Sequence, residues 1–187
     1  MKTVVVKIKG VSPYQQGRFH KTEKTEKEQP ADYEKRTWQE KAHYDKDGNV
    51  FIPPLAVKNC LVEAGKYTSK QIAGQGKKTY TQKFMSGILI TEPVFIGKKI
   101  DDAKPMWVFG DSKGKRGGTG GRVEKCFPTF PEWEGDVTIY VLDEIITEDV
   151  LKEHLLEAGR FIGIGVFRPA NNGYYGRFDV EKITWLK

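Results

Sequence analysis

The 187-residue chain has only two cysteines, Cys60 and Cys126, and three histidines. His20, His43 and His154 form no HxxxH pair, and no CxxC motif accompanies them. Zinc and similar metals need such spacings, so we expect no metal site. Two distant cysteines form no disulfide framework, which fits a reducing cytoplasm. Cys60 falls on an apolar helical face, where a buried free thiol is the simplest interpretation.

Long apolar runs are scarce as well. The N-terminal segment MKTVVVKIKG has a run of three apolar residues, which is too short for the core of a signal peptide. No stretch approaches the roughly 18 apolar residues of a membrane-spanning helix. We therefore expect one globular domain over residues 1–187, located in the cytoplasm and without a membrane partner.

Enzyme motifs are few. GxSxG and HExxH do not occur, and the acid pairs at 101–102 and 148–149 are neighbours in sequence rather than a cluster on a scaffold. GRFIGIG at 159–165 has the glycines of a dinucleotide fingerprint, but it follows a predicted helix and does not open one. GGTGGR at 117–122 lacks the spacing of a phosphate-binding P-loop. We expect no cofactor, and we favour a non-catalytic protein.

Apolar periodicity predicts six core elements. Val4, Val6 and Ile8 alternate with more polar positions, which indicates a half-buried strand. Helices are predicted over 53–66 and 147–160, where apolar residues recur at helical spacing. Further strands are predicted over 87–97, bent or ended near Pro93, over 135–143, and over 176–186, where Ile183 and Trp185 are out of phase and indicate a bulge.

The predicted order is βαββαβ. It is typical of an α+β fold of the ferredoxin-like or RRM-like type, with an antiparallel sheet, two helices on one face and an open second face. Three insertions interrupt it: a polar, mobile excursion at 11–47 with a short helix around Tyr33 to Trp38, a basic loop at 66–83, and a glycine-rich loop at 97–125.

Positive charge is in moderate excess, because 31 lysines and arginines face 25 acids and give a formal charge of +6. Much of that excess lies in 66–83, 110–125 and 159–178, together with glycines and aromatic rings. Cations neutralise phosphates, and rings stack on unpaired bases, so these segments predict single-stranded nucleic-acid binding. The candidate residues are Lys70, Lys77, Lys78, Lys83, Lys113, Lys115, Arg116, Arg122, Arg160, Arg168, Tyr174, Tyr175 and Arg177. We expect Phe161 and Phe178 to pack inward.

Two of these segments carry a family resemblance. NVFIPPLAVKNCLVEAGK at 49–66 resembles the strand, turn and Lys-containing helix of the CRISPR-associated RAMP superfamily, with Lys58 in the basic place. GIGVFRPANNGYYGRFDV at 163–180 resembles the glycine-rich segment before the last strand of that superfamily. The matching residues are Gly163, Gly165, Arg168, Gly173, Gly176 and Arg177. The insertion from Trp107 to Lys125 looks like the thumb of crRNA-binding backbone subunits.

The resemblance implies a nucleic-acid-binding role for Lys58. It also implies a non-catalytic backbone-like subunit that assembles along single-stranded nucleic acid, RNA more than DNA, as a homo-oligomer or inside a nucleoprotein complex. A compact phage or mobile-element relative would fit too, and so would a phage-encoded inhibitor or mimic that docks on such a complex. The enzymatic alternative is a metal-independent, CRISPR-repeat-type endoribonuclease, for which His20, His43 and Tyr44 are the candidate acid–base groups.

Overall fold

The computed structural model describes residues 1–111 and 121–186. Three predicted nucleic-acid contacts, Lys113, Lys115 and Arg116, lie outside the described residues.

The main sheet has four strands: β1 (Lys2–Gly10), β4 (Ile88–Leu89), β8 (Glu134–Val141) and β9 (Phe178–Leu186). They lie in the order β4-β8-β1-β9, and all neighbours are antiparallel. Helix α2 (Pro54–Thr68) lies on the connection from β1 to β4, and α4 (Glu148–Glu157) connects β8 to β9. Each of these two strand pairs is parallel and is separated by one strand. This is the split βαβ arrangement, so the predicted ferredoxin-like order is confirmed.

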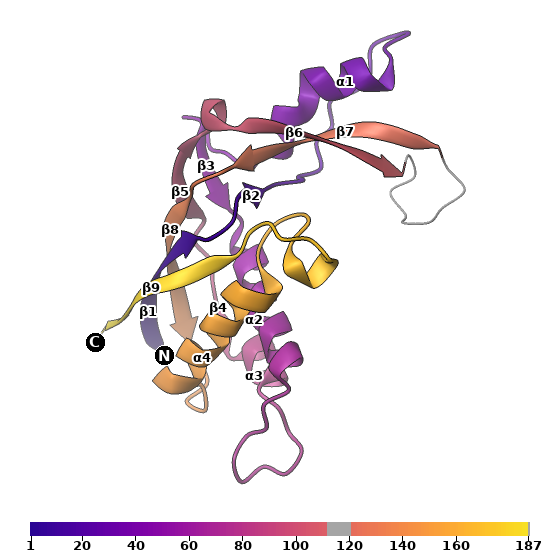
Figure 1. The fold of residues 1–187 in the computed structure, drawn as a ribbon. Helices are drawn as coiled ribbons and strands as arrows, with labels where there is room; N and C mark the ends of the chain where they lie inside the picture. Colours follow the sequence, from indigo (N-terminus) through magenta and orange to yellow (C-terminus); the bar gives the residue numbers. More distant parts are fainter. Residues whose placement is uncertain (112–120, 187) are drawn as a thin grey trace.

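The hydrophobic core lies between this sheet and the two helices, which Figure 1 shows on the same side of the sheet. Val4, Val6 and Ile8 of β1 are buried, as their alternation predicts. On α2 the buried residues recur at helical spacing and include Val57, Cys60, Leu61 and Ala64. The core thus follows directly from the two apolar periods in the sequence.

A register shift in β9 corrects the phase of its apolar residues. Val6 pairs with Ile183 and Ile8 pairs with Val180, and the shift falls between Lys7 and Ile8. Residues that pair directly share a face of the sheet. Val180 and Ile183 therefore both face the helices, although they are three residues apart. The predicted bulge is confirmed.

The predicted strand at 87–97 is two short strands with Pro93 between them. β4 pairs with β8, whereas β5 (Val94–Lys99) pairs with β3 (Asn49–Ile52) in a separate two-stranded sheet. Proline cannot donate to a strand ladder, so the chain leaves one sheet there and enters another.

The sequence led us to expect a loop over the glycine-rich insertion, but most of its described length forms β-strands. β6 (Lys104–Asp111) pairs with β7 (Arg122–Phe130) from Lys104–Thr129 to Asp111–Arg122. The two-residue β2 (Tyr14–Gln15) extends this sheet to the order β2-β7-β6. The β6–β7 hairpin projects away from the main sheet (Figure 1).

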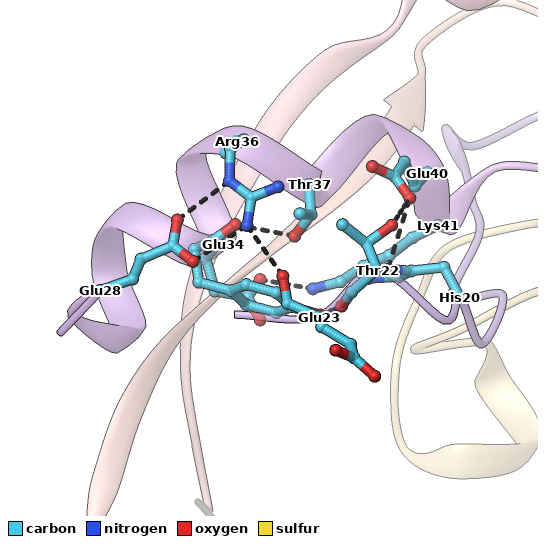
Figure 2. A network of polar contacts seen from close by, with 10 residues as sticks. His20, Thr22, Glu23, Glu28, Glu34, Arg36, Thr37, Glu40 and Lys41 are labelled. Carbon is cyan, nitrogen blue, oxygen red and sulfur yellow. Dashed lines mark hydrogen bonds and ion pairs between the residues drawn. The ribbon is translucent and has the colours of Figure 1, made fainter. Parts of the chain in front are cut away.

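The polar excursion contains the expected helix, α1 (Pro30–Thr37), followed by a 3-10 turn over Trp38–Lys41. These elements pack on β7. Lys41 Nζ donates to the Cys126 carbonyl at 2.9 Å, and the Cys126 amide donates to Glu34 Oε2 at 2.9 Å. Glu34 and Lys41 also form an ion pair, which lies within the polar network of Figure 2. The side chains of Lys41 and Glu34 therefore bond the backbone carbonyl and amide of Cys126 on the edge of β7, as the backbone of a neighbouring strand would.

The basic insertion is shorter than expected, because α2 continues to Thr68 and α3 (Thr81–Ser86) begins soon after. Between them a bridge from Gln71 to Thr79 closes a small loop over residues 69–80, called the basic loop below. Figure 1 shows this loop at the opposite end of the molecule from the β6–β7 hairpin.

Candidate nucleic-acid interface

A groove of about 600 Å³ separates the β6–β7 hairpin from residues 163–177, called the glycine-rich segment below. Arg122 and Lys125 supply positive charge on the hairpin wall. The lining also includes Val108, Phe109, Gly110, Phe127, Gly165, Val166, Phe167, Asn171 and Asn172. Cations, rings and amides beside one another are the groups that bind phosphates and unpaired bases.

Aromatic contacts join the two walls. Phe127 on β7 meets Phe167 edge to face, with ring centroids 5.3 Å apart. Lys41 Nζ lies 4.9 Å from the Phe127 centroid on the α1 side, which is a cation–π contact. Phe167 remains 37% exposed and has a φ of 52°, a left-handed conformation that is rare for an aromatic residue. Its carbonyl accepts from the Tyr175 amide at 3.1 Å, which helps to hold this conformation.

The glycines let the chain cross itself closely. A Cβ on Gly176 would lie 1.8 Å from the Ile164 carbonyl oxygen, and φ at Gly176 is +68°. A Cβ on Gly165 would lie 2.2 Å from the Gln15 carbonyl oxygen. The Gly176 amide donates to the Pro13 carbonyl at 2.8 Å, and the Val166 amide donates to Gln15 at 3.2 Å. The Gly176 and Val166 amides are thus engaged inside the protein rather than open to a phosphate.

Arg168 is tied to α2. Its guanidinium lies 2.8 Å from one oxygen of Glu63 and donates to the other at 2.9 Å. Such a bidentate pair fixes the geometry of both partners. Arg168 therefore fastens the glycine-rich segment to α2, and its positive charge is already matched. Lys58 is half-buried one turn from the start of the same helix.

The tyrosine pair has one buried and one exposed member. The rings stack with centroids 4.3 Å apart, and the Tyr174 hydroxyl donates to the Tyr175 hydroxyl at 2.9 Å. The Tyr175 hydroxyl donates to Met106 Sδ on β6 at 2.7 Å. Burial raises the pKa of Tyr175 to about 12. Tyr175 thus anchors the segment to the hairpin, while Tyr174 is 59% exposed and offers a free ring face.

The other predicted residues lie in different places. Lys70 pairs with Glu153, and Lys83 Nζ lies 2.9 Å from Asp143. Lys77 and Lys78 are exposed on the basic loop. Arg160 is exposed beyond the end of α4, and the Arg177 guanidinium donates to the Arg160 carbonyl. The structure therefore brings Arg122 to the groove and places most of the predicted lysines elsewhere.

One predicted core residue is wrong. Phe178 is buried, but Phe161 is 44% exposed. Ile162 takes the inward position instead, within the π-helical turn that residues 158–162 form.

The candidate acid–base residues have separate surroundings. His20 Nδ1 lies 3.6 Å from Glu40, and its ring stacks on Tyr33 (Figure 2 shows the Glu40 contact). The His43 ring faces Phe51, with centroids 5.8 Å apart, and burial holds its pKa below the ordinary value. Tyr44 forms a backbone bridge with Val50.

The open face of the sheet carries matched charges. Lys7 Nζ lies 3.5 Å from Glu134 and 3.3 Å from Glu181, and Lys9 Nζ lies 3.9 Å from Glu181. The Tyr140 hydroxyl donates to Glu92 at 2.6 Å. This face therefore differs from the aromatic stacking platform that RNA-recognition modules present.

Four groove residues were missed by our sequence reasoning: Phe109, Phe127, Asn171 and Asn172. Phe109 lies in the range that we took for a loop, and Phe127 lies just beyond it. The asparagines follow a proline in a segment that we described by its glycines, arginines and aromatic rings. The alternation of apolar and polar residues that marks a strand would not have identified the two rings, because apolar residues occupy both faces of β6.

Within residues 1–111 and 121–186, no group of three or more His, Cys, Asp and Glu side chains could hold a metal ion. Among the helices of that part of the chain, none is long and apolar enough to span a bilayer.

No protein-family model and no curated protein matches the chain. Solved structures do. A chain in the cryo-EM structure of the Type III-B Cmr-beta bound to cognate target RNA aligns with a TM-score of 0.56 at 16% identity, over 100% of this chain and 61% of that chain. Cmr6 from Pyrococcus furiosus aligns with a TM-score of 0.52 at 12% identity, over 95% of this chain and 97% of that chain. The protein therefore has the fold of the RAMP subunits of Type III-B CRISPR complexes.

Proposed function

We propose that this protein binds single-stranded RNA, in preference to DNA, in the groove between the β6–β7 hairpin and the glycine-rich segment. The observation that carries the proposal is the groove itself, in which Arg122 and Lys125 stand beside partly exposed phenylalanine rings. Guanidinium and ammonium groups would pair with phosphates, and the rings would stack on bases that a duplex keeps hidden. The groove therefore suits an unpaired strand.

The fold supports RNA as the ligand. The Type III-B Cmr-beta structure is described as bound to cognate target RNA, and its matching chain has the fold of this protein. We propose that this protein likewise serves as a subunit of a cytoplasmic nucleoprotein complex and assembles along the strand with further copies or related subunits. The projecting β6–β7 hairpin is fastened at the edge of β7, which suits a wall that must keep its shape when RNA binds.

We also propose that binding is not followed by cleavage. The support is that His20 contacts Glu40 and Tyr33, whereas His43 faces Phe51, so the two rings have different neighbours. Metal-independent RNA cleavage needs an acid and a base around one phosphate. Incubating labelled hairpin RNA with the protein in EDTA tests this, since intact RNA is the expected result and defined fragments would restore the endoribonuclease alternative.

The binding proposal is tested by fluorescence anisotropy with labelled single-stranded RNA, the matching DNA strand and the RNA duplex over a salt series. We expect tightest binding to single-stranded RNA and an affinity that falls steeply with salt, because bound phosphates release counterions. Equal affinity for the duplex, or an affinity that does not respond to salt, would contradict the proposal.

A further inference from the structure

Tyr67 and Phe161 form a stacked aromatic pair on the surface. Tyr67 lies near the C-terminal end of α2, and Phe161 lies in the π-helical turn after α4. Their ring centroids are 5.3 Å apart with planes 22° from parallel. The side chains are 59% and 44% exposed, so each ring keeps accessible surface. Exposed large rings stacked from two elements are unusual for a surface that only meets water.

The π-helical turn is held by contacts that direct Phe161 outward. A Cβ on Gly159 would lie 2.0 Å from the Phe178 carbonyl oxygen, so the turn rests directly on the start of β9. The Gly163 amide donates to the Ala158 carbonyl at 2.9 Å and closes the turn, and Ile162 is buried. The outward ring therefore follows from a fixed backbone, and π-helical turns of this kind are frequent at functional sites.

Each ring of the pair has a cation next to it in the sequence. Lys66 precedes Tyr67, Arg160 precedes Phe161, and both cations are exposed. Neither forms an ion pair with a carboxylate whose side chain the structure describes. Lys70 and Lys83, by contrast, are each paired with an acid. Exposed cations next to stacked rings in the sequence fit the phosphates and base of a single-stranded nucleic acid better than an apolar protein surface.

The aromatic pair is connected to the groove through Arg168 and Glu63. Phe167 lines the groove, and the next residue, Arg168, is paired with Glu63 on α2. Tyr67 lies four residues after Glu63 on that helix, which is about 6 Å along the axis and on the same face. The Arg168–Glu63 ion pair thus connects the segment that lines the groove to the helix that carries Tyr67.

We propose that Tyr67 and Phe161 form a second base-stacking site, which takes up an unpaired base of the strand after it leaves the groove. This inference rests on the proposed function, because the same RNA occupies both sites. Lys66 and Arg160 bind the phosphates that flank the stacked base. The site is sequence-tolerant, since every base has a face that can stack.

A length series separates the two sites. Fluorescent oligouridylates from about 4 to about 16 nucleotides are titrated against the wild type, a Tyr67→Leu/Phe161→Leu variant and a matched Tyr67→Phe/Phe161→Tyr control. Short oligonucleotides occupy the groove and do not reach the pair, so all three proteins bind them equally. Long strands also reach the pair, and there the leucine variant binds about tenfold more weakly than the wild type and the ring-preserving control.

The outcomes are distinct. A selective loss on long strands, with the control unchanged, supports the second site. If the leucine variant matches the wild type at every length, the inference is overturned while the groove stands, and the pair is then free to serve a protein partner. If no strand binds the wild type, the proposed function fails and this inference fails with it. Photo-crosslinking of 5-iodouridine in a long strand to Tyr67 or Phe161 supports stacking without any variant, and its absence from both rings counts against it.

Discussion

The ring of Phe127 meets the ring of Phe167 edge to face, with centroids 5.3 Å apart, and this contact joins the two walls of the groove. Phe127 belongs to the β6–β7 hairpin and Phe167 to the glycine-rich segment, which lie about 40 residues apart in the chain. The shape of the groove therefore depends on how firmly each wall is fixed to the rest of the molecule.

The hairpin wall depends on Lys41, which bridges Glu34 and the Cys126 carbonyl in a largely buried position. Lys41→Met leaves the Glu34 carboxylate without its cation, so we expect a loss of about 3 kcal/mol in the free energy of unfolding. Urea denaturation measures this. Lys35→Met on the neighbouring helix α1 breaks the exposed pair with Asp32 and should cost at most about 0.5 kcal/mol. Similar losses for the two variants would refute the bridging role.

The other wall depends on close chain crossings at glycine. Gly176→Ala puts a methyl group on the Ile164 carbonyl and should destabilise the protein by about 3 kcal/mol. Gly74 in the basic loop has a similar φ of +75°, but a Cβ there meets nothing within 4 Å. Gly74→Ala should therefore cost only about 1 kcal/mol, the strain of a left-handed alanine. Thermal denaturation of both variants would expose an error if they proved equally stable.

Stability should fall in mild acid because of a buried histidine. His154 is fully buried, its Nδ1 lies 2.7 Å from the Val150 carbonyl, and burial holds its pKa below the ordinary value. Below about pH 6.5 the unfolded chain binds a proton that the folded protein resists, so the free energy of unfolding decreases as pH falls. The pKa of His43 is lowered for the same reason and adds to the effect.

His154→Leu removes one of these two contributions. We expect the variant to lose less stability than the wild type between neutral pH and about pH 5, although some slope remains from His43. Urea denaturation at a series of pH values measures the two slopes. Identical slopes would show that His154 titrates in the folded protein as it does in the unfolded chain.

The core could be predicted from the sequence, and the groove could not. Local periods of two and about 3.6 residues predict which side chains are buried on β1 (Val4, Val6 and Ile8) and on α2. The β6–β7 hairpin is different, since its strands are held by pairing with each other and by Glu34 and Lys41 from a distant helix. Nothing local distinguishes its glycine-containing sequence from a loop.

Single residues of the candidate site could not be predicted from the sequence either, because their surroundings depend on residues far away in the chain. A count of cations gave Arg168 and Arg122 equal weight, but Arg168 is bound to Glu63, 105 positions away in the chain. Phe161 was expected in the core because it adjoins a predicted helix, whereas it lies exposed in the π-helical turn that follows α4. Charge and ring content could be predicted, but which groups remain free for a ligand depends on long-range partners.

The most direct test compares two variants that each remove two positive charges. Arg122→Ala/Lys125→Ala changes the groove, and Lys77→Ala/Lys78→Ala changes the basic loop at the far end of the molecule. Anisotropy titrations with single-stranded RNA over a salt series give the affinity and its salt slope for both. We predict that the groove variant binds at least about tenfold more weakly, with a slope reduced by about 1.4 for the two lost phosphate contacts, while the loop variant binds as the wild type does. Equal losses in the two variants, or a groove variant with unchanged affinity and slope, would contradict the groove as the RNA site.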